Sequence, residues 1–317
     1  MTSDIATPCH GRGIIAGDMT SFDLCCESLD GLSVGDAVGA QFFVPGTTVT
    51  HITEATEPPG AWPWTDDTEM ACSIVDELAG HGRIDRDRLA AAFVRRYEPY
   101  RGYGGGAVVI LHQIRDGVPW REAARSAFDG LGSMGNGAAM RVAPLGAFHA
   151  GDSRSAALDA MRTAEVTHAH SEGILGAVAV AVAAAEAAWS RLVEAPLEPV
   201  ELFDAVLAYQ VDSQVKTGLR RARDLLGASV AEAAYTLGNG SQVLAQDTVP
   251  FALWVAATHL SDYRSAILAC VEAGGDVDTT AAIVGGVVAA AAGRAAIPDA
   301  WLTHREPLPS WVRTADS

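Results

Sequence analysis

The spacing of apolar residues constrains the fold of this chain more than any other feature. From Leu24 onward, apolar side chains recur mostly at helical intervals, and the alternation of β-branched residues that is typical of strands is scarce. Residues 44–64 are rich in Pro, Gly and Thr and are expected to form a long loop. The pattern predicts a large all-α domain. Helices are expected near residues 66–80, 86–100, 105–116, 120–128, 153–164, 171–190, 200–209, 213–226, 229–236, 250–258, 262–273 and 279–293.

Three glycines near the start of the periodic region predict a close helix contact. Gly31, Gly35 and Gly39 are spaced four residues apart and therefore lie on one face of a helix. Each glycine costs up to about 1 kcal/mol in helix propensity. In return, a face without side chains lets another backbone approach closely.

The chain has 317 residues, enough for one large domain or two ordinary ones. Pro196 and Pro199 mark a turn near the middle, but no change in composition accompanies it. We therefore expect one domain over residues 23–300. Residues 1–22 are polar and aperiodic and are expected to form a flexible tail, and residues 301–317 a C-terminal extension.

The charge balance argues against two classes of partner. Lys and Arg total 22 against 39 Asp and Glu, which gives a net charge of −17. Such a field repels nucleic-acid phosphates and anionic lipids. The longest apolar stretch, residues 173–185, is also too short to span a bilayer. We therefore expect no direct nucleic-acid binding and no membrane, whereas a site that gathers cations suits the chain.

The cysteines indicate a reducing compartment. Their number is odd and none belongs to a C-x-x-C pair, so a disulfide framework and a structural zinc site are not expected. The first twenty residues contain charged side chains and no apolar core of a signal peptide. We expect a cytoplasmic protein. The five cysteines are Cys9, Cys25, Cys26, Cys72 and Cys270.

Two short acidic motifs each open an apolar helix. One is Thr65-Asp66-Asp67-Thr68, and the other is Asp276-Val277-Asp278-Thr279, some 210 residues later. Either motif could simply cap its helix, because Asp and Thr accept hydrogen bonds from the first N–H groups. A cap needs only one oxygen, however, and each motif supplies two carboxylates beside a hydroxyl.

Convergence of the two motifs would create a site for divalent cations. Four carboxylates would otherwise repel one another, and two divalent cations would neutralise them. Carboxylate and hydroxyl oxygens are ligands that suit Mg²⁺ and Mn²⁺. The four residues concerned are Asp66, Asp67, Asp276 and Asp278.

Three other segments could contact an anionic ligand. The turn 101–106 (RGYGGG) precedes a helix and could present backbone N–H groups to phosphate oxygens, although a flexible turn explains it equally. Residues 133–141 (SMGNGAAMR) are expected to form an irregular loop of backbone donors. His168 and His170 do not share a helical face, so a two-histidine zinc site is disfavoured. A single histidine at this helix start could donate to an anion.

These motifs, in this order, resemble the ADP-ribosylglycohydrolase family, which includes the enzyme that reactivates dinitrogenase reductase. The resemblance covers roughly residues 24–295 and rests on five segments. They are Gly31–Ala40 (GLSVGDAVGA), Trp64–Thr68 (WTDDT), Gly135–Arg141 (GNGAAMR), Thr167-His168 and Gly274–Thr279 (GGDVDT). The resemblance implies a compact, all-α orthogonal bundle with a site for two Mg²⁺ or Mn²⁺ ions. It also implies hydrolysis of the N- or O-glycosidic bond between ADP-ribose and a protein side chain.

The resemblance also implies which residues form the site. The family's metal ligands fall on Thr65, Asp66, Asp67, Asp276, Asp278 and Thr279. Its contacts to the diphosphate and adenosine of ADP-ribose fall on Gly104, Gly105, Gly106, Phe128, Gly132, Ser133, Met134 and His168. Asp36 and Arg141 also match motif positions, and structural or supporting roles are expected for them.

The sequence departs from the family pattern at Phe43. Many members carry a glutamate there, which reaches a metal or its water. A phenylalanine can neither ligate a metal nor move a proton. Some members that cleave arginine-linked ADP-ribose also lack this glutamate, so arginine-linked substrates are expected to be preferred over serine-linked ones.

The expected reaction is metal-assisted hydrolysis at the anomeric carbon of the distal ribose, through a transition state that resembles an oxocarbenium ion. Asp67 or Asp278 is the candidate base for the attacking water. Two alternatives stay open: a module that binds ADP-ribose without cleaving it, and a hydrolase of a free nucleotide or another ADP-ribosyl compound. The expected partners are an ADP-ribosylated protein and ADP-ribose.

Overall fold

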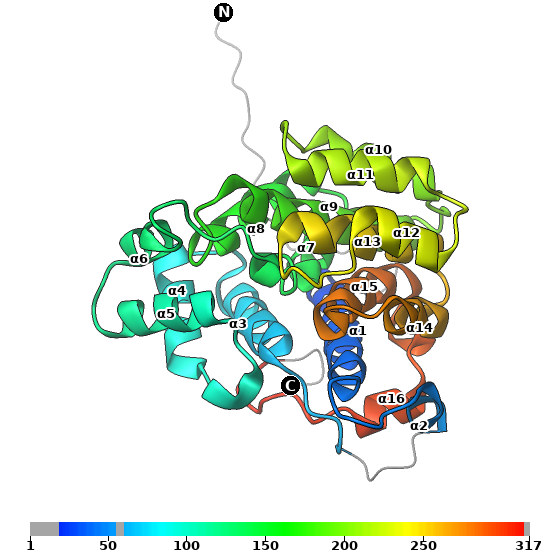
Figure 1. Ribbon diagram of the computed structural model, residues 1–317, viewed down its shortest axis with the longest axis horizontal. Helices are drawn as coiled ribbons and strands as arrows, with labels where there is room; N and C mark the ends of the chain where they lie inside the picture. The colour runs from blue at the N-terminus through cyan, green and yellow to red at the C-terminus, as the bar shows by residue number, and fades with distance from the viewer. Residues whose placement is uncertain (1–18, 55–59, 314–317) are drawn as a thin grey trace, which may run out of the picture.

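The computed structural model describes residues 19–54 and 60–313, and over these ranges it confirms the all-α prediction. The described chain forms sixteen α-helices and three short 3₁₀ helices, with no β-strand (Figure 1). The α-helices are α1 (Ser21–Gln41), α2 (Val49–Glu54), α3 (Asp66–His81), α4 (Arg86–Arg96), α5 (Gly105–Arg115), α6 (Trp120–Ser126), α7 (Ala143–Phe148), α8 (Ser153–Glu165), α9 (Ser171–Leu192), α10 (Pro199–Ala208), α11 (Gln214–Asp224), α12 (Val230–Leu237), α13 (Ala245–Thr258), α14 (Tyr263–Ala273), α15 (Val277–Ala292) and α16 (Asp299–His304).

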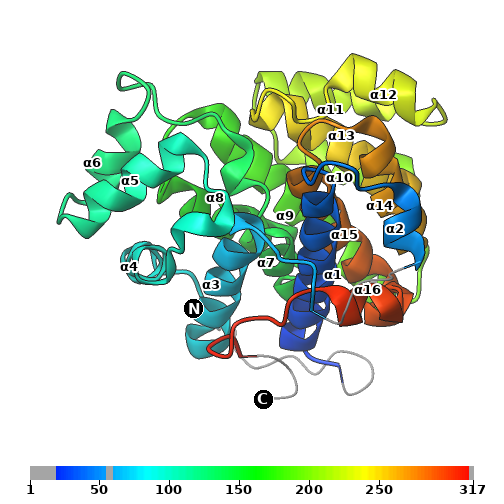
Figure 2. The same ribbon diagram turned by 60° about the horizontal axis from the view of Figure 1, so that its bottom comes forward.

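Helices α1 and α15 pack against each other over the glycine face that the sequence predicts. They lie side by side in both ribbon views (Figures 1 and 2). A Cβ atom built on Gly35 would lie 2.1 Å from the carbonyl oxygen of Ala281, and one built on Gly39 would lie 2.5 Å from the Cα atom of Asp278. The two backbones are therefore too close for any side chain at these positions.

Helix α9 runs through the centre of the core. Every residue from Ala177 to Ala185 is at most 2% exposed, and the helix packs against α7, α8, α13 and α15. The small alanine side chains of α9 allow these neighbouring helices to pack closely against it. At 22 residues, α9 is the one described helix that is long and apolar enough to cross a membrane. However, 72% of its most apolar window is buried inside the protein, as in a core helix.

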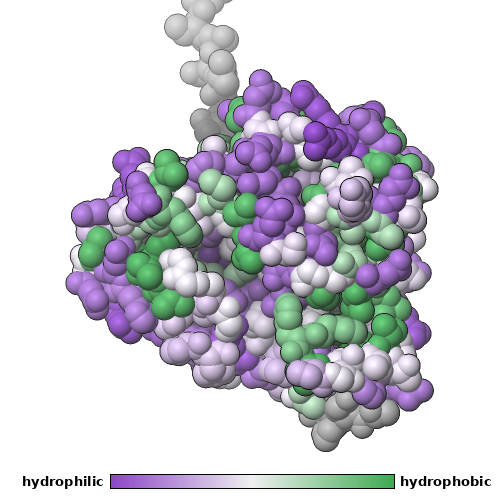
Figure 3. All heavy atoms as spheres, viewed as in Figure 1, coloured by the Kyte–Doolittle hydropathy of each residue, from purple (hydrophilic) through white to green (hydrophobic). Residues whose placement is uncertain are grey.

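Helices α3 to α6 form a group at one end of the molecule, on the left in Figure 1. Each packs against the next in chain order. The space-filling view of the same face shows a hollow between the α5 side and the central helices, within a surface that is mainly hydrophilic (Figure 3). This group carries the glycine turn that precedes α5, and so it positions one of the predicted substrate segments.

The structure corrects the expected ends of the domain. Helix α1 begins at Ser21, because Thr20 caps it and accepts a hydrogen bond from the N–H of Asp23 at 3.2 Å. Residues 20–22 of the expected tail are therefore part of the fold, whereas residues 1–18 lie outside the described residues. Residues 301–313, expected as a C-terminal extension, pack against the rest of the described chain. Trp301 is 2% exposed and its indole N–H donates to the carbonyl of Ile52 at 3.0 Å.

Two further expectations needed correction. The loop expected over residues 44–64 contains the short helix α2, whose Ile52 is buried, while residues 55–59 lie outside the described residues. Helix α13 begins at Ala245 rather than at residue 250, so Pro250 lies inside the helix. The described cysteines Cys25, Cys26, Cys72 and Cys270 are buried and form no disulfide among themselves, and Cys9 lies outside the described residues.

The contact between α1 and α15 predicts the effect of a single methyl group. Gly35→Ala would place its Cβ against the backbone of α15, so we expect the free energy of unfolding to fall by about 2 kcal/mol despite the better helix propensity of alanine. Chemical denaturation measures this change. In Gly80→Ala the new Cβ would meet only the flexible Arg313 side chain, and a change of at most about 1 kcal/mol, in either direction, is expected. Equal effects of the two substitutions would contradict the account.

Candidate metal centre

The two acidic motifs converge. Helix α3 begins at Asp66 and α15 begins at Val277, and both starts face the C-terminal part of α1. One carboxylate oxygen from each of Asp36, Asp67 and Asp278 lies within 4.8 Å of the other two. Segments some 210 residues apart therefore form a single acidic cluster, which sequence alone could not establish.

Asp36 holds the start of α3 in place. Its buried carboxylate accepts hydrogen bonds from the backbone N–H of Thr65 at 2.9 Å and of Thr68 at 3.1 Å. The hydroxyl of Thr68 also donates to it, at 2.5 Å. The structural role expected for Asp36 is therefore present. The position of Asp36 within the cluster was not anticipated, although the residue belongs to one of the motifs.

The hydroxyl of Thr65 connects two of the carboxylates. It lies 2.9 Å from an oxygen of Asp36 and 2.9 Å from an oxygen of Asp67, while Thr65 is the N-cap of α3. The second oxygen of Asp67, Oδ1, is buried and has no hydrogen-bond partner among the described residues. On α15, Thr279 is buried and its backbone N–H donates to Oδ1 of Asp278 at 2.8 Å.

Asp276 is linked to the loop over residues 133–141. The side-chain amide of Asn136 donates to Asp276 at 2.6 Å and to the hydroxyl of Thr248 at 3.1 Å. The backbone N–H of Asn136 donates to the carbonyl of Val243, a β-branched residue with a positive φ of 58°. Sequence reasoning missed Asn136 as a site residue, although its Asn-Gly pair marked the loop as irregular.

Burial and mutual repulsion raise the pKa values of the cluster. Burial raises the pKa of Asp36 to about 6. Burial, with the neighbouring charge of Asp36, raises the pKa of Asp66 to about 8. The pKa values of Asp67 and Asp278 are also raised well above the usual range, by burial and then by adjacent carboxylates that include Asp276. Burial and repulsion therefore favour the protonated forms of these carboxylates unless a cation neutralises them.

The donor set fits a hard divalent cation. Asp36, Asp67 and Asp278 offer carboxylate oxygens and Thr65 offers a hydroxyl oxygen, and such oxygens are the ligands of Mg²⁺ and Mn²⁺. The unpartnered Oδ1 of Asp67 is the most specific sign, because a buried carboxylate oxygen normally has a hydrogen-bond or metal partner. Asp66 and Asp276 are not among the three residues whose carboxylate oxygens lie within 4.8 Å of one another. The charge of Asp276 nevertheless raises the pKa values of Asp66, Asp67 and Asp278.

The predicted glycine turn lies beside the cluster. A Cβ built on Gly102 would be 3.8 Å from Oδ1 of Asp66. Gly104 precedes α5, and Gly105 is its first residue. Gly106 lies against the ring of Phe128, because a Cβ there would come within 2.9 Å of Cζ. The glycine turn and Phe128, which is 57% exposed, are thus brought together.

The remaining predicted contacts lie in or next to the loop over residues 133–141 and at His168. A Cβ on Gly135 would lie 3.2 Å from the hydroxyl of Ser133 and 3.6 Å from Nε2 of His168. Gly132 has a positive φ of 76° and lies against Ala169, while the carbonyl of Met134 accepts from the N–H of Ala245 at 3.0 Å. Asn136, in the same loop, joins this group to Asp276.

Arg141 orients His168 from inside the core. Its guanidinium donates to the hydroxyl of Thr167 at 2.9 Å, and this hydroxyl lies 2.8 Å from Nδ1 of His168. Because the hydroxyl accepts from Arg141, it can donate its own proton to Nδ1, which leaves the proton of the neutral ring on Nε2. Burial, with the charge of Arg141, lowers the pKa of His168 to about 3. His168 is therefore a neutral donor.

Phe43 follows the end of α1 and is 56% exposed, whereas the preceding Phe42 packs against the core. Its ring is therefore available at the surface.

The neutral state of His168 predicts a stability loss in acid. The unfolded chain binds a proton as the pH falls through about 6.5, whereas the folded protein does so only near 3. This histidine should therefore lower the free energy of unfolding by about 2 kcal/mol at pH 5 relative to pH 8. Denaturant unfolding at both pH values, compared with His168→Gln, isolates the effect. A His168 ring resonance that titrates near pH 6.5 in the folded protein would contradict it.

Known proteins are similar to this chain over most of its length. ADP-ribosylhydrolase ARH3 from Gallus gallus is 27% identical over 337 aligned residues, which cover 91% of this chain and 90% of that protein. An uncharacterized protein from Archaeoglobus fulgidus is 31% identical and covers 86% of this chain and 88% of its own length. A solved structure described as an ADP-ribosylglycohydrolase-related protein complex matches with a TM-score of 0.60 at 23% identity, over 90% of this chain and 93% of that chain, and supports the fold. A family model described as ADP-ribosylglycohydrolase matches residues 18–316, and this chain therefore belongs to the ADP-ribosylglycohydrolase family.

Proposed function

We propose that this protein is a metal-dependent hydrolase that releases ADP-ribose from a modified protein side chain. The observation that carries the proposal is the convergence of the α3 and α15 starts into one buried acidic cluster, with an unpartnered oxygen on Asp67. Family membership and similarity to proteins named ADP-ribosylhydrolase ARH3 support the reaction class.

Six residues would hold the cations of this site. Two Mg²⁺ or Mn²⁺ ions would position and polarise the ribose hydroxyls and a water molecule. Asp36 would keep Thr65 and the start of α3 in place through its backbone hydrogen bonds. The proposed ligands are Thr65, Asp66, Asp67, Asp276, Asp278 and Thr279.

Asp67 and Asp278 are the proposed general bases. Either carboxylate would accept a proton from the water that attacks the anomeric carbon of the distal ribose, while the bond to the side chain breaks. The unpartnered Oδ1 of Asp67 supports this role for Asp67, because no hydrogen bond within the described residues occupies it. The ribose would pass through a state resembling an oxocarbenium ion.

The rest of the ADP-ribose would occupy the region between the glycine turn and His168. The backbone N–H groups of Gly104–Gly106 and the Nε2 proton of His168 would donate to diphosphate oxygens. Phe128, with its exposed ring, would provide an apolar face for the adenosine. Gly132, Ser133 and Met134 would complete this side of the site. We further propose that the protein acts in the cytoplasm.

A turnover assay tests the function. With ADP-ribosyl-arginine as substrate, ADP-ribose should appear with Mg²⁺ and not with a chelator. Asp278→Ala should abolish turnover and leave the metal-free protein folded, because one of several repelling charges is removed. The matched control is Asp299→Ala, an exposed first-turn aspartate of α16, which should keep the wild-type rate. Binding of ADP-ribose without any turnover would instead favour a binding module, and cleavage of free ADP-ribosyl compounds alone would favour the other alternative.

Arginine-linked ADP-ribose should be released faster than serine-linked ADP-ribose. A serine alkoxide is a poor leaving group and depends on acid–base help, which typically contributes 10²–10⁴-fold. Phe43 cannot provide this help, whereas a guanidine leaves more readily and its cation suits a protein of net charge −17. Matched peptides that carry each linkage, assayed with saturating Mg²⁺, measure the ratio. Faster release from the serine peptide would overturn this preference without affecting the reaction class.

A further inference from the structure

A small cavity lies on the α4–α6 side of the molecule, apart from the acidic cluster. Its volume is about 210 Å³, and residues of α4, α6, the end of α8 and the start of α9 line it. Buried Trp120, Ala124 and His168 contribute to its wall. None of the carboxylates of the acidic cluster lines it.

Cations dominate the rim of this cavity. The arginines Arg86, Arg121 and Arg125 line it against a single carboxylate, that of Glu165, which already pairs with Arg86. Arg121 lies 3.8 Å from Asp87, whereas Arg125 has no hydrogen-bond or ion-pair partner among the described residues. The cavity therefore has a net positive charge and a guanidinium that is free to bind.

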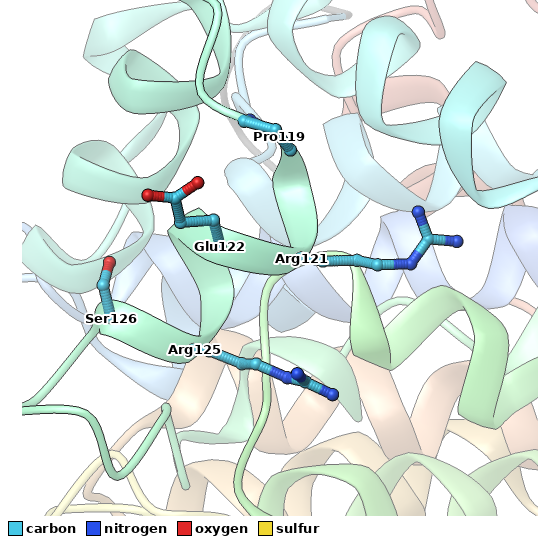
Figure 4. A pocket seen from close by; sticks show the side chains of 5 residues that line it. All are labelled: Pro119, Arg121, Glu122, Arg125 and Ser126. Atoms are coloured by element: carbon cyan, nitrogen blue, oxygen red, sulfur yellow. The ribbon is translucent and has the colours of Figure 1, made fainter.

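Arg121 and Arg125 are placed to act together. They are four residues apart on α6 and so share one side of the helix. Figure 4 shows both guanidinium groups extending to the same side, whereas Glu122 and Ser126 extend to the other. A shallower hollow that these four residues and Pro119 line adjoins the cavity (Figure 4).

Trp120 fixes the direction of two of the cations. The guanidinium carbon of Arg121 lies 4.2 Å from the centre of a Trp120 ring, and that of Arg86 lies 5.6 Å from it. The indole N–H donates to Asp87 at 2.6 Å and so holds the ring in place. Stacked guanidinium groups keep their N–H edges available for an oxyanion.

The segment that contains α4, α5 and α6 has a net positive charge, whereas the whole chain has a net negative charge. Residues 83–126 contain nine arginines and five acidic residues, although the protein has a net charge of −17. Four of these arginines, Arg86, Arg88, Arg96 and Arg101, pair with carboxylates outside the segment, whereas Arg125 has no such partner among the described residues. A cluster of like charges costs free energy unless a counter-ion neutralises it.

We propose that this cavity binds a phosphate group, with Arg121 and Arg125 as its principal ligands. Guanidinium groups bind phosphate oxygens through two parallel hydrogen bonds, which favours phosphate over a spherical anion. A volume of about 210 Å³ is below the range of 300–1,000 Å³ usual for drug-sized ligands, so the occupant is one small anion. The site does not depend on the proposed hydrolase function.

Thermal unfolding of the metal-free protein tests the site. Inorganic phosphate or pyrophosphate should raise the melting temperature in the presence of a chelator, compared with KCl of equal ionic strength. In Arg125→Gln the dissociation constant of phosphate should rise at least about tenfold, because the variant loses one charge-assisted hydrogen bond. The control is Arg115→Gln on α5, a half-exposed arginine outside the cavity, which should respond like the wild type. Equal shifts in the wild type and both variants would overturn the proposal.

Calorimetric titration with ADP-ribose, again without metal, distinguishes two sources of the phosphate. If Arg125→Gln weakens ADP-ribose binding and pyrophosphate competes with it, the cavity takes the phosphates of ADP-ribose. If ADP-ribose binding is unchanged while phosphate binding is lost, the cavity is a separate site for free phosphate. Because neither measurement involves turnover, failure of the phosphate site and failure of the hydrolase function give different results.

Discussion

The close contact between α1 and α15 is the constraint on which the site depends. With glycine at positions 31, 35 and 39, the backbone of α1 approaches that of α15 so closely that a Cβ would meet the opposite main chain at 2.1–2.5 Å. Asp36 occupies the same stretch of α1 and accepts hydrogen bonds from the first turn of α3. One helix therefore fixes the starts of two others. The acidic cluster is a product of this packing, since neither motif could reach the other through local structure alone.

The same packing brings buried carboxylates close enough to repel one another. Several carboxylates share a space where burial and mutual repulsion raise their pKa values, in Asp66 to about 8. A stable fold does not need such an arrangement, because apolar residues would fill the space without repulsion. Perturbed pKa values of this kind typically mark functional sites. Arg141, which is buried without a carboxylate among its hydrogen-bond partners, has a related effect on His168, whose neutral form it favours.

Much of the fold could be predicted from sequence, and the reasons for the failures are physical. Helical spacing and the glycine row identified most helices and the face of α1 that another backbone approaches, because both signals are local. Helix α2 and the burial of Trp301 were missed because they stabilise each other through the hydrogen bond from Trp301 to Ile52, a contact across about 250 residues. In the site, the two motifs were recognisable from their paired carboxylates. Asn136 and the position of Asp36 were not, because their roles depend on where other segments lie.

The central claim is that the starts of α3 and α15 form one divalent-cation site. Anomalous diffraction at the manganese edge from crystals soaked in Mn²⁺ tests it most directly. We expect two peaks within about 4 Å of each other, the spacing usual in two-metal sites, in contact with the carboxylates of Asp67 and Asp278. Manganese peaks elsewhere in the molecule, with none at this cluster, would contradict it.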